Sequence, residues 1–153
     1  MDKVNIVNAR LDHSEIIWQW RNDPQTQKMF FDGRRISISE HKNWYKNALL
    51  DDRVIIYVGE ANQHPVGVIR FDQNINKQFD VSINISPDKR GLGIGKVLLV
   101  EGIKKLKNFK NESLIIFASV KNVNAYSHSL FKACGFKKFF ENDQIIKYKF
   151  EFN

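Results

Sequence analysis

A strand-like segment, a glycine-rich loop and an amphipathic helix follow one another, and this junction constrains the fold more than any other part of the chain. The segment Phe79–Ile85 precedes the loop Arg90-Gly91-Leu92-Gly93-Ile94-Gly95-Lys96, after which apolar residues at helical spacing continue to about Asn108. Glycines let backbone N–H groups approach a ligand, and a helix N-terminus carries partial positive charge. Because Arg90 and Lys96 add two full charges, the junction predicts an anion site that suits a pyrophosphate.

The loop differs from two common phosphate-binding motifs. A P-loop would have glycine where Arg90 stands and Ser or Thr where Val97 stands. A dinucleotide-binding motif would have its third glycine at Lys96 and would follow the first strand of its unit. A glycine-rich turn that merely joins a strand to a helix is the plain structural alternative.

The rest of the chain alternates between helical and strand-like patterns, which predicts an α+β domain. Helices are expected at His13–Arg21, Ser39–Leu50 with Ser39 as N-cap, Gly95–Asn108 and Asn124–Ala133. Strands are expected at Val4–Arg10, Val54–Gly59, Val66–Phe71, Phe79–Ile85, Ser113–Val120, Phe136–Phe140 and Ile145–Phe152. The order β-α-α-β-β-β-α-β-α-β-β contains no internal repeat and predicts a single domain over residues 1–153.

Charge and composition narrow the set of partners. The 153 residues include 24 Lys and Arg against 17 Asp and Glu, so the net charge is +7, and 42% of positions are hydrophobic, as in a globular domain. Excess positive charge attracts any polyanion. The basic residues are dispersed, however, and the densest group, Lys104 to Lys110, lies on the polar side of a predicted helix. No zinc-finger spacing, aromatic RNA-binding motif or basic arm occurs, so we expect no nucleic-acid partner.

The cysteine and histidine content indicates whether the chain could bind a metal ion and whether it works in a reducing compartment. One cysteine and four scattered histidines offer neither an intramolecular disulfide nor a metal-ligand spacing. We therefore expect no metal and a reducing compartment. The start Met1-Asp2-Lys3 is not followed by an apolar leader, and apolar runs elsewhere are too short to span a membrane. We expect a cytoplasmic protein with no membrane partner.

A second motif follows the first along the chain. Asn124-x-x-Ser127-x-x-Leu130-Phe131-Lys132-x-x-Gly135-Phe136 resembles the Asn-x-x-Ala-x-x-Leu-Tyr-x-x-x-Gly-Phe signature of the GNAT superfamily of N-acetyltransferases, and Arg90 to Gly95 resembles its Arg/Gln-x-x-Gly-x-Gly/Ala acetyl-CoA loop. The resemblance covers nearly the whole chain. It implies a mostly antiparallel mixed sheet of about seven strands, splayed between the fourth and fifth strands and flanked by about four helices. The cosubstrate would lie in that split.

Carried over by position, the resemblance implies a set of acetyl-CoA contacts. The loop backbone would hold the pyrophosphate, the end of the fourth strand would pair with the pantetheine amides, Asn124 would contact the pantetheine, and Ser127 and Phe131 would lie near the thioester. The implied cofactor-binding residues are Ile83, Asn84, Ile85, Arg90, Gly91, Leu92, Gly93, Ile94, Gly95, Lys96, Asn124, Ser127 and Phe131.

The resemblance also implies catalytic residues. Asp80, early in the fourth strand, aligns with a carboxylate that many relatives carry there, and would accept the amine proton through water; a solvent-exposed aspartate is the plain alternative. Phe131 replaces the tyrosine that protonates the departing thiolate, so Ser127 would orient a water or solvent would supply the proton. Tyr126 lies five residues earlier and points elsewhere. Cys134 is expected to be a small buried hydrophobe rather than a nucleophile.

Three segments carry clues to the acceptor. Trp18-x-Trp20-Arg21-Asn22-Asp23-Pro24, His41-x-x-Trp44 and Val68-Ile69-Arg70-Phe71-Asp72 resemble acetyltransferases that act on the 4-amino group of nucleotide-linked deoxysugars in pseudaminic acid synthesis. They resemble ribosomal-protein N-terminal acetyltransferases more loosely. The implied substrate-binding residues are Arg21, Asn22, His41, Trp44 and Arg70.

Each of these residues also has a plain structural role. Arg70 and Asp72 share a strand face and would form a salt bridge. Trp18 and Trp20 cannot both face the core of one helix. Arg21 and Asn22 would then end a helix, and His41 and Trp44 would serve as capping and core residues.

Three classes of function therefore stay open. The first is an acetyl-CoA-dependent N-acetyltransferase acting on an amino-sugar nucleotide, which we favour. The second is a peptide N-terminal or polyamine acetyltransferase of the same fold, and the third is a noncatalytic acyl-CoA-binding module. The sequence is compatible with a homodimer.

Overall fold

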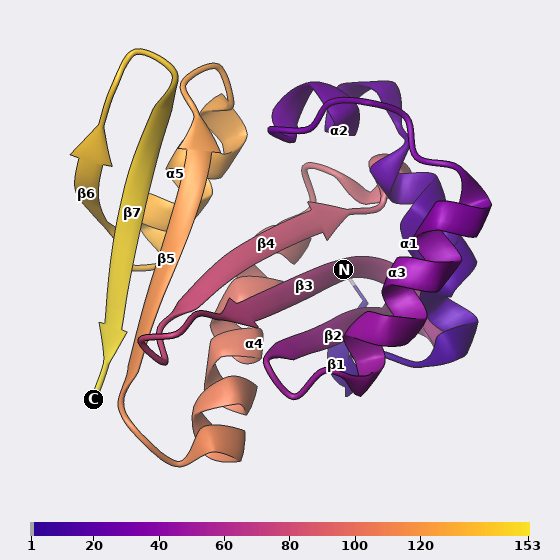
Figure 1. Ribbon diagram of the computed structural model, residues 1–153, viewed down its shortest axis with the longest axis horizontal. Helices are drawn as coiled ribbons and strands as arrows, with labels where there is room; N and C mark the ends of the chain where they lie inside the picture. The colour runs from indigo at the N-terminus through magenta and orange to yellow at the C-terminus, as the bar shows by residue number, and fades with distance from the viewer. Residues whose placement is uncertain (1) are drawn as a thin grey trace.

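A computed structural model describes residues 2–153, which form a seven-stranded sheet with helices on both faces (Figure 1). The strand order is β1-β2-β3-β4-β5-β7-β6. The strands are β1 (Val4–Asn8), β2 (Val54–Ala61), β3 (His64–Gln73), β4 (Phe79–Ile85), β5 (Leu114–Lys121), β6 (Lys137–Glu141) and β7 (Ile145–Phe152). The helices are α1 (Ser14–Arg21), α2 (Pro24–Met29), α3 (Ile38–Leu50), α4 (Ile94–Lys110) and α5 (Ala125–Ala133), with 3-10 turns at Leu11–His13 and Pro87–Lys89.

Helix α2 corrects the expected number of helices from four to five. The sequence Asn22-Asp23-Pro24 predicts the end of a helix, and α1 does end there. Pro24 then starts a new helix, because proline suits the first helical position and the Asp23 side chain accepts a hydrogen bond from the Thr26 backbone N–H at 3.2 Å. The same residues therefore both stop and start a helix.

The start of α3 also differs from the prediction. The N-cap is Ser37 rather than Ser39, and the Ser37 hydroxyl accepts a hydrogen bond from the Glu40 N–H at 3.1 Å. Both serines precede helical residues, and the Ser37 spacing to Glu40 completes the cap. The N-cap therefore lies two residues earlier than the sequence pattern indicates.

The sheet splits between β4 and β5. This is the parallel pair of the sheet, and its pairing covers only Phe79 with Ile116 and Asp80 with Phe117 within the described chain. Beyond Asp80 the two strands diverge (Figure 1). The other neighbouring strands pair antiparallel. The predicted splay between the fourth and fifth strands is confirmed.

Helix α4 packs closely against one face of the sheet because two glycines lie beneath it. Gly59 of β2 pairs with Gly67 of β3, and a Cβ added at either would lie 2.7 or 2.6 Å from the Leu98 side chain. Leu98 is fully buried. The main core lies on this face, between the sheet, α4 and α5.

A second apolar cluster joins α1 and α3 to the opposite face. Ile17, Trp20 and Tyr45 pack against Ile56 and Val58 of β2. Trp20 is only 3% exposed, so the prediction that just one of the two α1 tryptophans faces the core is confirmed. Among residues 2–153, no helix has both the length and the apolar character to cross a membrane.

Strand β6 forms one edge of the sheet. Every residue of β6 is exposed, and its register against β7 shifts between Lys138 and Phe140. The Lys149 ammonium lies 5.4 Å from the centre of the Phe139 ring. The edge strand is therefore short, charged and irregular.

Candidate active site

The glycine loop presents backbone to solvent at the start of α4. Gly91 and Gly93 have φ angles of 78° and 80°, the left-handed region that glycine adopts most readily, and Gly93 is the N-cap of α4. A Cβ at either position would meet nothing within 4 Å. The first N–H groups of a helix lack partners within the helix, so this loop fits an anionic pyrophosphate, as the sequence predicts.

The Arg90 side chain points away from the glycine loop and toward α2. Its guanidinium donates hydrogen bonds to Gln25 Oε1 at 3.0 Å, to Asp23 Oδ2 at 3.2 Å and to Thr26 Oγ1 at 2.6 Å. Burial alone would raise the pKa of Asp23, but the Thr26 N–H and Arg90 together lower it below its ordinary value. The predicted pyrophosphate contact therefore applies to the Arg90 backbone, while its side chain is already occupied by α2.

Tyr126 lies against the loop, which the sequence did not predict. A Cβ added at Gly95 would clash with the Tyr126 hydroxyl and would lie 3.3 Å from the Leu130 side chain. Burial raises the pKa of Tyr126. The prediction that this tyrosine points away from the position of Phe131 is consistent with its place beside Gly95.

The end of β4 leaves one backbone edge open. Ile83, Asn84 and Ile85 pair with β3, but in the described chain β4 pairs with β5 only at Phe79 and Asp80. The unpaired edge faces the split. An extended chain of amides can bind such an edge as a further strand, which is the arrangement predicted for the pantetheine.

The start of α5 holds the second motif. The Asn124 side chain caps the helix by accepting a hydrogen bond from the Ser127 N–H at 3.1 Å. Ser127 is half-buried. The Phe131 ring is 4% exposed, edge-on to Phe136 at 5.1 Å and stacked on Tyr148 at 6.3 Å between ring centres. Asn124 and Phe131 thus have structural roles, and their contacts with the cosubstrate stay predictions.

Asp80 lies where the strand pairing ends. It is opposite Asp72 of β3 and Phe117 of β5, and its side chain is exposed. Although the residue is exposed, the protein packed around its carboxyl group partly removes water from it and so raises the pKa of Asp80; Lys147 opposes this shift and Asp72 reinforces it. A carboxylate with a raised pKa is a stronger base than an ordinary aspartate, and the general-base role of Asp80 stays a prediction.

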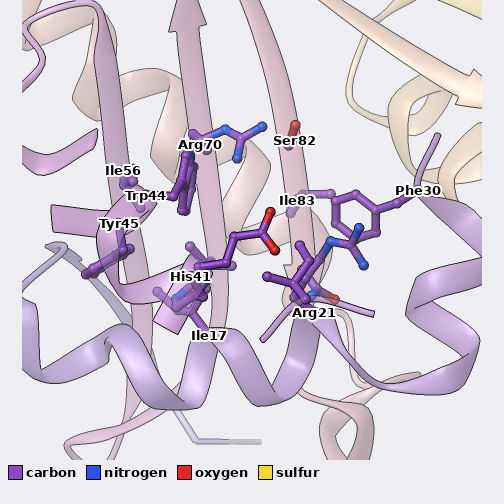
Figure 2. A pocket seen from close by; sticks show the side chains of 14 residues that line it. Ile17, Arg21, Phe30, His41, Trp44, Tyr45, Ile56, Arg70, Ser82 and Ile83 are labelled. Atoms are coloured by element: carbon purple, nitrogen blue, oxygen red, sulfur yellow. The ribbon is translucent and has the colours of Figure 1, made fainter. Parts of the chain in front are cut away.

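A cavity of about 320 Å³ lies beside the split, between α1, α3 and the sheet (Figure 2). We call it the α1–α3 cavity. Figure 2 shows Arg21 and Phe30 on one side of it, and Trp44 and Arg70 on the other. Its lining residues are Ile17, Arg21, Phe30, Ile36, Glu40, His41, Trp44, Tyr45, Ile56, Val68, Arg70, Ser82, Ile83 and Asn84. The cavity therefore reaches the open end of β4.

Four of the five predicted substrate-binding residues line this cavity, namely Arg21, His41, Trp44 and Arg70. Asn22 does not. It is 7% exposed, and its side-chain amide donates to Ile36 O at 2.8 Å and accepts from Ile36 N at 3.0 Å. Both ends of its amide hold the chain that leads into α3, and its predicted contact with the substrate stays a prediction.

Two polar atoms of the cavity residues are buried and have no hydrogen-bond partner in residues 2–153. They are Arg21 Nη1 and His41 Nε2. His41 is 4% exposed, and burial lowers its pKa despite an opposing hydrogen bond to the Ser14 backbone, so the imidazole is neutral near pH 7. A buried polar group without a partner is costly. Both residues belong to the lining of the α1–α3 cavity.

The other charged groups of the cavity are already paired. Arg70 donates to Asp72 at 3.0 Å, the salt bridge expected from their spacing, and lies 5.2 Å from the centre of the Trp44 ring. Glu40 accepts from Arg34 Nη1 at 3.0 Å. His41 is not the surface capping residue of the structural alternative, and Trp44 is 41% exposed rather than in the core.

Cys134 shows no sign of activation. It is half-buried, and burial raises the pKa of its thiol. A thiol with a raised pKa is a poor nucleophile at neutral pH. Residues 2–153 also contain no cluster of His, Cys, Asp and Glu that could hold a metal ion.

Comparisons with known proteins agree with this geometry. The Acetyltransferase (GNAT) family model matches residues 14–136. No curated protein matches the chain. A domain from Methanocaldococcus jannaschii of solved structure has a TM-score of 0.84 at 22% identity, over 99% of this chain and 100% of that one.

Two further solved structures have the same fold. Spermidine N-acetyltransferase from Vibrio cholerae, in complex with CoA and spermine, has a TM-score of 0.85 at 19% identity, over 97% of this chain and 95% of that one. Ribosomal-protein-alanine N-acetyltransferase from Brucella melitensis has a TM-score of 0.78 at 18% identity, over 95% and 98%. The predicted mixed α+β fold is confirmed. From the family match and the site geometry, the chain belongs to the GNAT family and is an acetyl-CoA-dependent N-acetyltransferase.

Proposed function

We propose that this acetyltransferase acts on a small amine that also carries anionic oxygens, and that its acceptor class is a nucleotide-linked amino-deoxysugar with a free 4-amino group. The observation that carries the proposal is the presence of two arginines, Arg21 and Arg70, in the lining of the α1–α3 cavity. A buried cationic N–H group favours an anionic oxygen as its partner. The neutral imidazole of His41 suits a hydroxyl or carbonyl group of the same ligand.

The charge balance of the cavity supports an anionic acceptor over a polyamine. Arg21 and Arg70 line the cavity, and its one carboxylate, Glu40, is held by Arg34. A polyamine carries several positive charges, which two arginines would repel. An acceptor with a diphosphate would be attracted instead.

The reaction requires a neutral amine beside the open edge of β4, where Ser82, Ile83 and Asn84 border the cavity. Acetyl-CoA, when bound, supplies the acetyl group as a thioester. Asp80 accepts the amine proton through a water molecule, and its raised pKa strengthens it as a base. As the new N–C bond forms and the C–S bond breaks, the leaving sulfur takes a proton from solvent, since Phe131 has none to give.

The test is thiol release from acetyl-CoA with three acceptors: a 4-amino-sugar nucleotide, spermidine and an N-terminal peptide. We expect release with the sugar nucleotide, and Arg21→Met should raise the acceptor KM about tenfold or more. Arg53→Met is the matched control, because the Arg53 side chain is 73% exposed and, among the residues described, hydrogen-bonds only to Asp51. Release with spermidine alone, or an unchanged KM in Arg21→Met, would overturn the proposal.

A further inference from the structure

Helix α2 lies at the open end of the split, near the ends of β4 and β5 (Figure 1). Of its six residues only Thr26 is buried, so its own packing gives it little hold on the core. Side chains from outside the helix therefore contribute to its position. Two such side chains come from opposite sides of the split.

The first of these side chains, Arg90, holds the N-terminal end of α2. Its three hydrogen bonds to Asp23, Gln25 and Thr26 join segments that are 64 to 67 residues apart in the chain. The Arg90 and Asp23 side chains are only 33% and 21% exposed. A planar guanidinium can satisfy three acceptors at once, which an ammonium on a flexible stem does not do in the same geometry.

The second side chain, Lys121, holds the C-terminal end of α2. Lys121 is the last residue of β5, and its ammonium donates to the Lys28 carbonyl at 3.0 Å. The Lys121 carbonyl is itself within 2.9 Å of His128 Nε2 of α5. The end of β5 is thus fixed on one side by α5 and reaches α2 on the other.

The segment after α2 forms a wall of the α1–α3 cavity. Phe30 and Ile36 line the cavity, and the Arg21 guanidinium lies 4.2 Å from the centre of the Phe30 ring. The Ile36 carbonyl accepts from the Trp18 indole at 2.7 Å as well as from Asn22. A shift of α2 would therefore move this wall and the Arg21 guanidinium that lies over Phe30.

From these contacts we propose that Arg90 and Lys121 are positioning residues, which hold α2 across the split and thereby set the shape of the α1–α3 cavity. The Arg90 side chain accordingly affects acceptor binding through α2 and does not bind a phosphate, although Arg90 is the first residue of the glycine loop. Of the measurements that test this inference, only the acceptor KM rests on the proposed function. The order of α2 is measurable without any acceptor.

The test compares Arg90→Ala and Lys121→Ala with two matched controls, Lys89→Ala and Lys132→Ala. Both control lysines are exposed, and in the part of the chain described neither side chain forms a hydrogen bond or an ion pair with α2. Amide hydrogen exchange of residues 24–36 should speed up about tenfold in the two test variants and stay at the wild-type rate in the controls. Unchanged exchange in both test variants would overturn the inference, whatever acceptor the enzyme uses.

Two further measurements separate positioning from phosphate binding. Calorimetry of acetyl-CoA with Arg90→Ala should give an affinity within about threefold of wild type, while the acceptor KM rises about tenfold with a smaller change in kcat. Arg90→Lys keeps the charge but loses the three-acceptor geometry, so it should resemble Arg90→Ala. A tenfold loss of acetyl-CoA affinity in Arg90→Ala that Arg90→Lys restores would show a phosphate ligand and overturn the inference.

Discussion

The two binding regions of this enzyme are built from different parts of the polypeptide. The predicted acetyl-CoA region consists of backbone, taken from one continuous stretch, residues 90–96, and from the open edge of β4. The α1–α3 cavity consists of side chains from α1, α3, β2, β3, β4 and the loop between α2 and α3. A backbone site depends on conformation and tolerates most side-chain changes, whereas a side-chain site is altered by each replacement.

Asp80 belongs to neither region, and its substitution should have the largest effect. Asp80→Asn should lower kcat on the order of a hundredfold, as expected for loss of a general base, and leave acetyl-CoA affinity unchanged. The pKa of Asp80 is raised by burial, against the effect of Lys147 and with that of Asp72. Wild-type kcat should therefore fall as the pH drops through this raised pKa. A variant with wild-type kcat and pH profile would remove Asp80 from the mechanism.

The same variant predicts a change in stability. Because the folded pKa of Asp80 lies above its unfolded value, the folded state binds the proton more tightly, and stability falls as the pH rises through that interval. Asp80→Asn should therefore raise the melting temperature at pH 7 relative to wild type. The gain should vanish below the unfolded pKa, and scanning calorimetry at the two pH values checks it.

The next largest effect should come from the glycines of the backbone site. Gly93→Val combined with Gly95→Val should weaken acetyl-CoA binding by roughly thirtyfold or more, which corresponds to about 2 kcal/mol. Valine is strained at the φ of 80° at Gly93, and any Cβ at Gly95 meets Tyr126. Calorimetry gives the affinity, and circular dichroism controls for folding.

Replacing Lys96, a side chain of the same loop, should weaken acetyl-CoA binding much less than replacing the glycines. Lys96 is exposed, and Lys96→Ala removes a charge but leaves the loop backbone intact. Its effect on acetyl-CoA affinity should stay within about fivefold. If the lysine variant lost as much affinity as the double glycine variant, the cosubstrate would be bound by side chains rather than by the loop backbone.

A smaller effect is expected in the cavity. His41→Phe keeps a ring at a 4% exposed position but removes the unpartnered Nε2, so the acceptor KM should rise about tenfold with acetyl-CoA affinity unchanged. His64→Phe is the matched control, because His64 is exposed and lies outside the cavity. Equal KM values for the two variants would show that His41 does not contact the acceptor.

The smallest effect should follow Phe131→Tyr. The ring lies in the core against Phe136 and Tyr148, so a new hydroxyl has to be accommodated at a cost of about 1 kcal/mol. We expect a melting temperature lower by a few degrees and a rate within about threefold of wild type. A rate increase above tenfold would mean that the hydroxyl reaches the leaving sulfur and that its protonation limits turnover.

Local patterns explain what the sequence predicted. The strand, glycine loop and helix are contiguous, and the Arg70–Asp72 salt bridge needs only two residues on one strand face. These features follow from periodicity and spacing over a few residues. The split between β4 and β5 followed from the family resemblance, and the pairing confirms it.

Long-range contacts explain what the sequence did not predict. The three acceptors of Arg90 lie more than sixty residues away from it, and the buried state of His41 Nε2 depends on the packing of α1 against α3. Helix α2 was missed because Pro24 is both a helix stop and a favourable first residue. Tyr126 gave no signal, since only the folded chain brings its hydroxyl to Gly95.

The exposed edge strand β6 has a consequence for the behaviour of the enzyme in solution. A free strand edge can recruit other chains, and Phe139 and Phe140, at 57% and 49% exposure, would favour such association. Lys137, Lys138 and the register shift oppose it through charge and an irregular hydrogen-bonding edge. Part of the +7 net charge therefore maintains colloidal stability. High salt, which screens that charge, should be the condition under which the protein is most prone to aggregate.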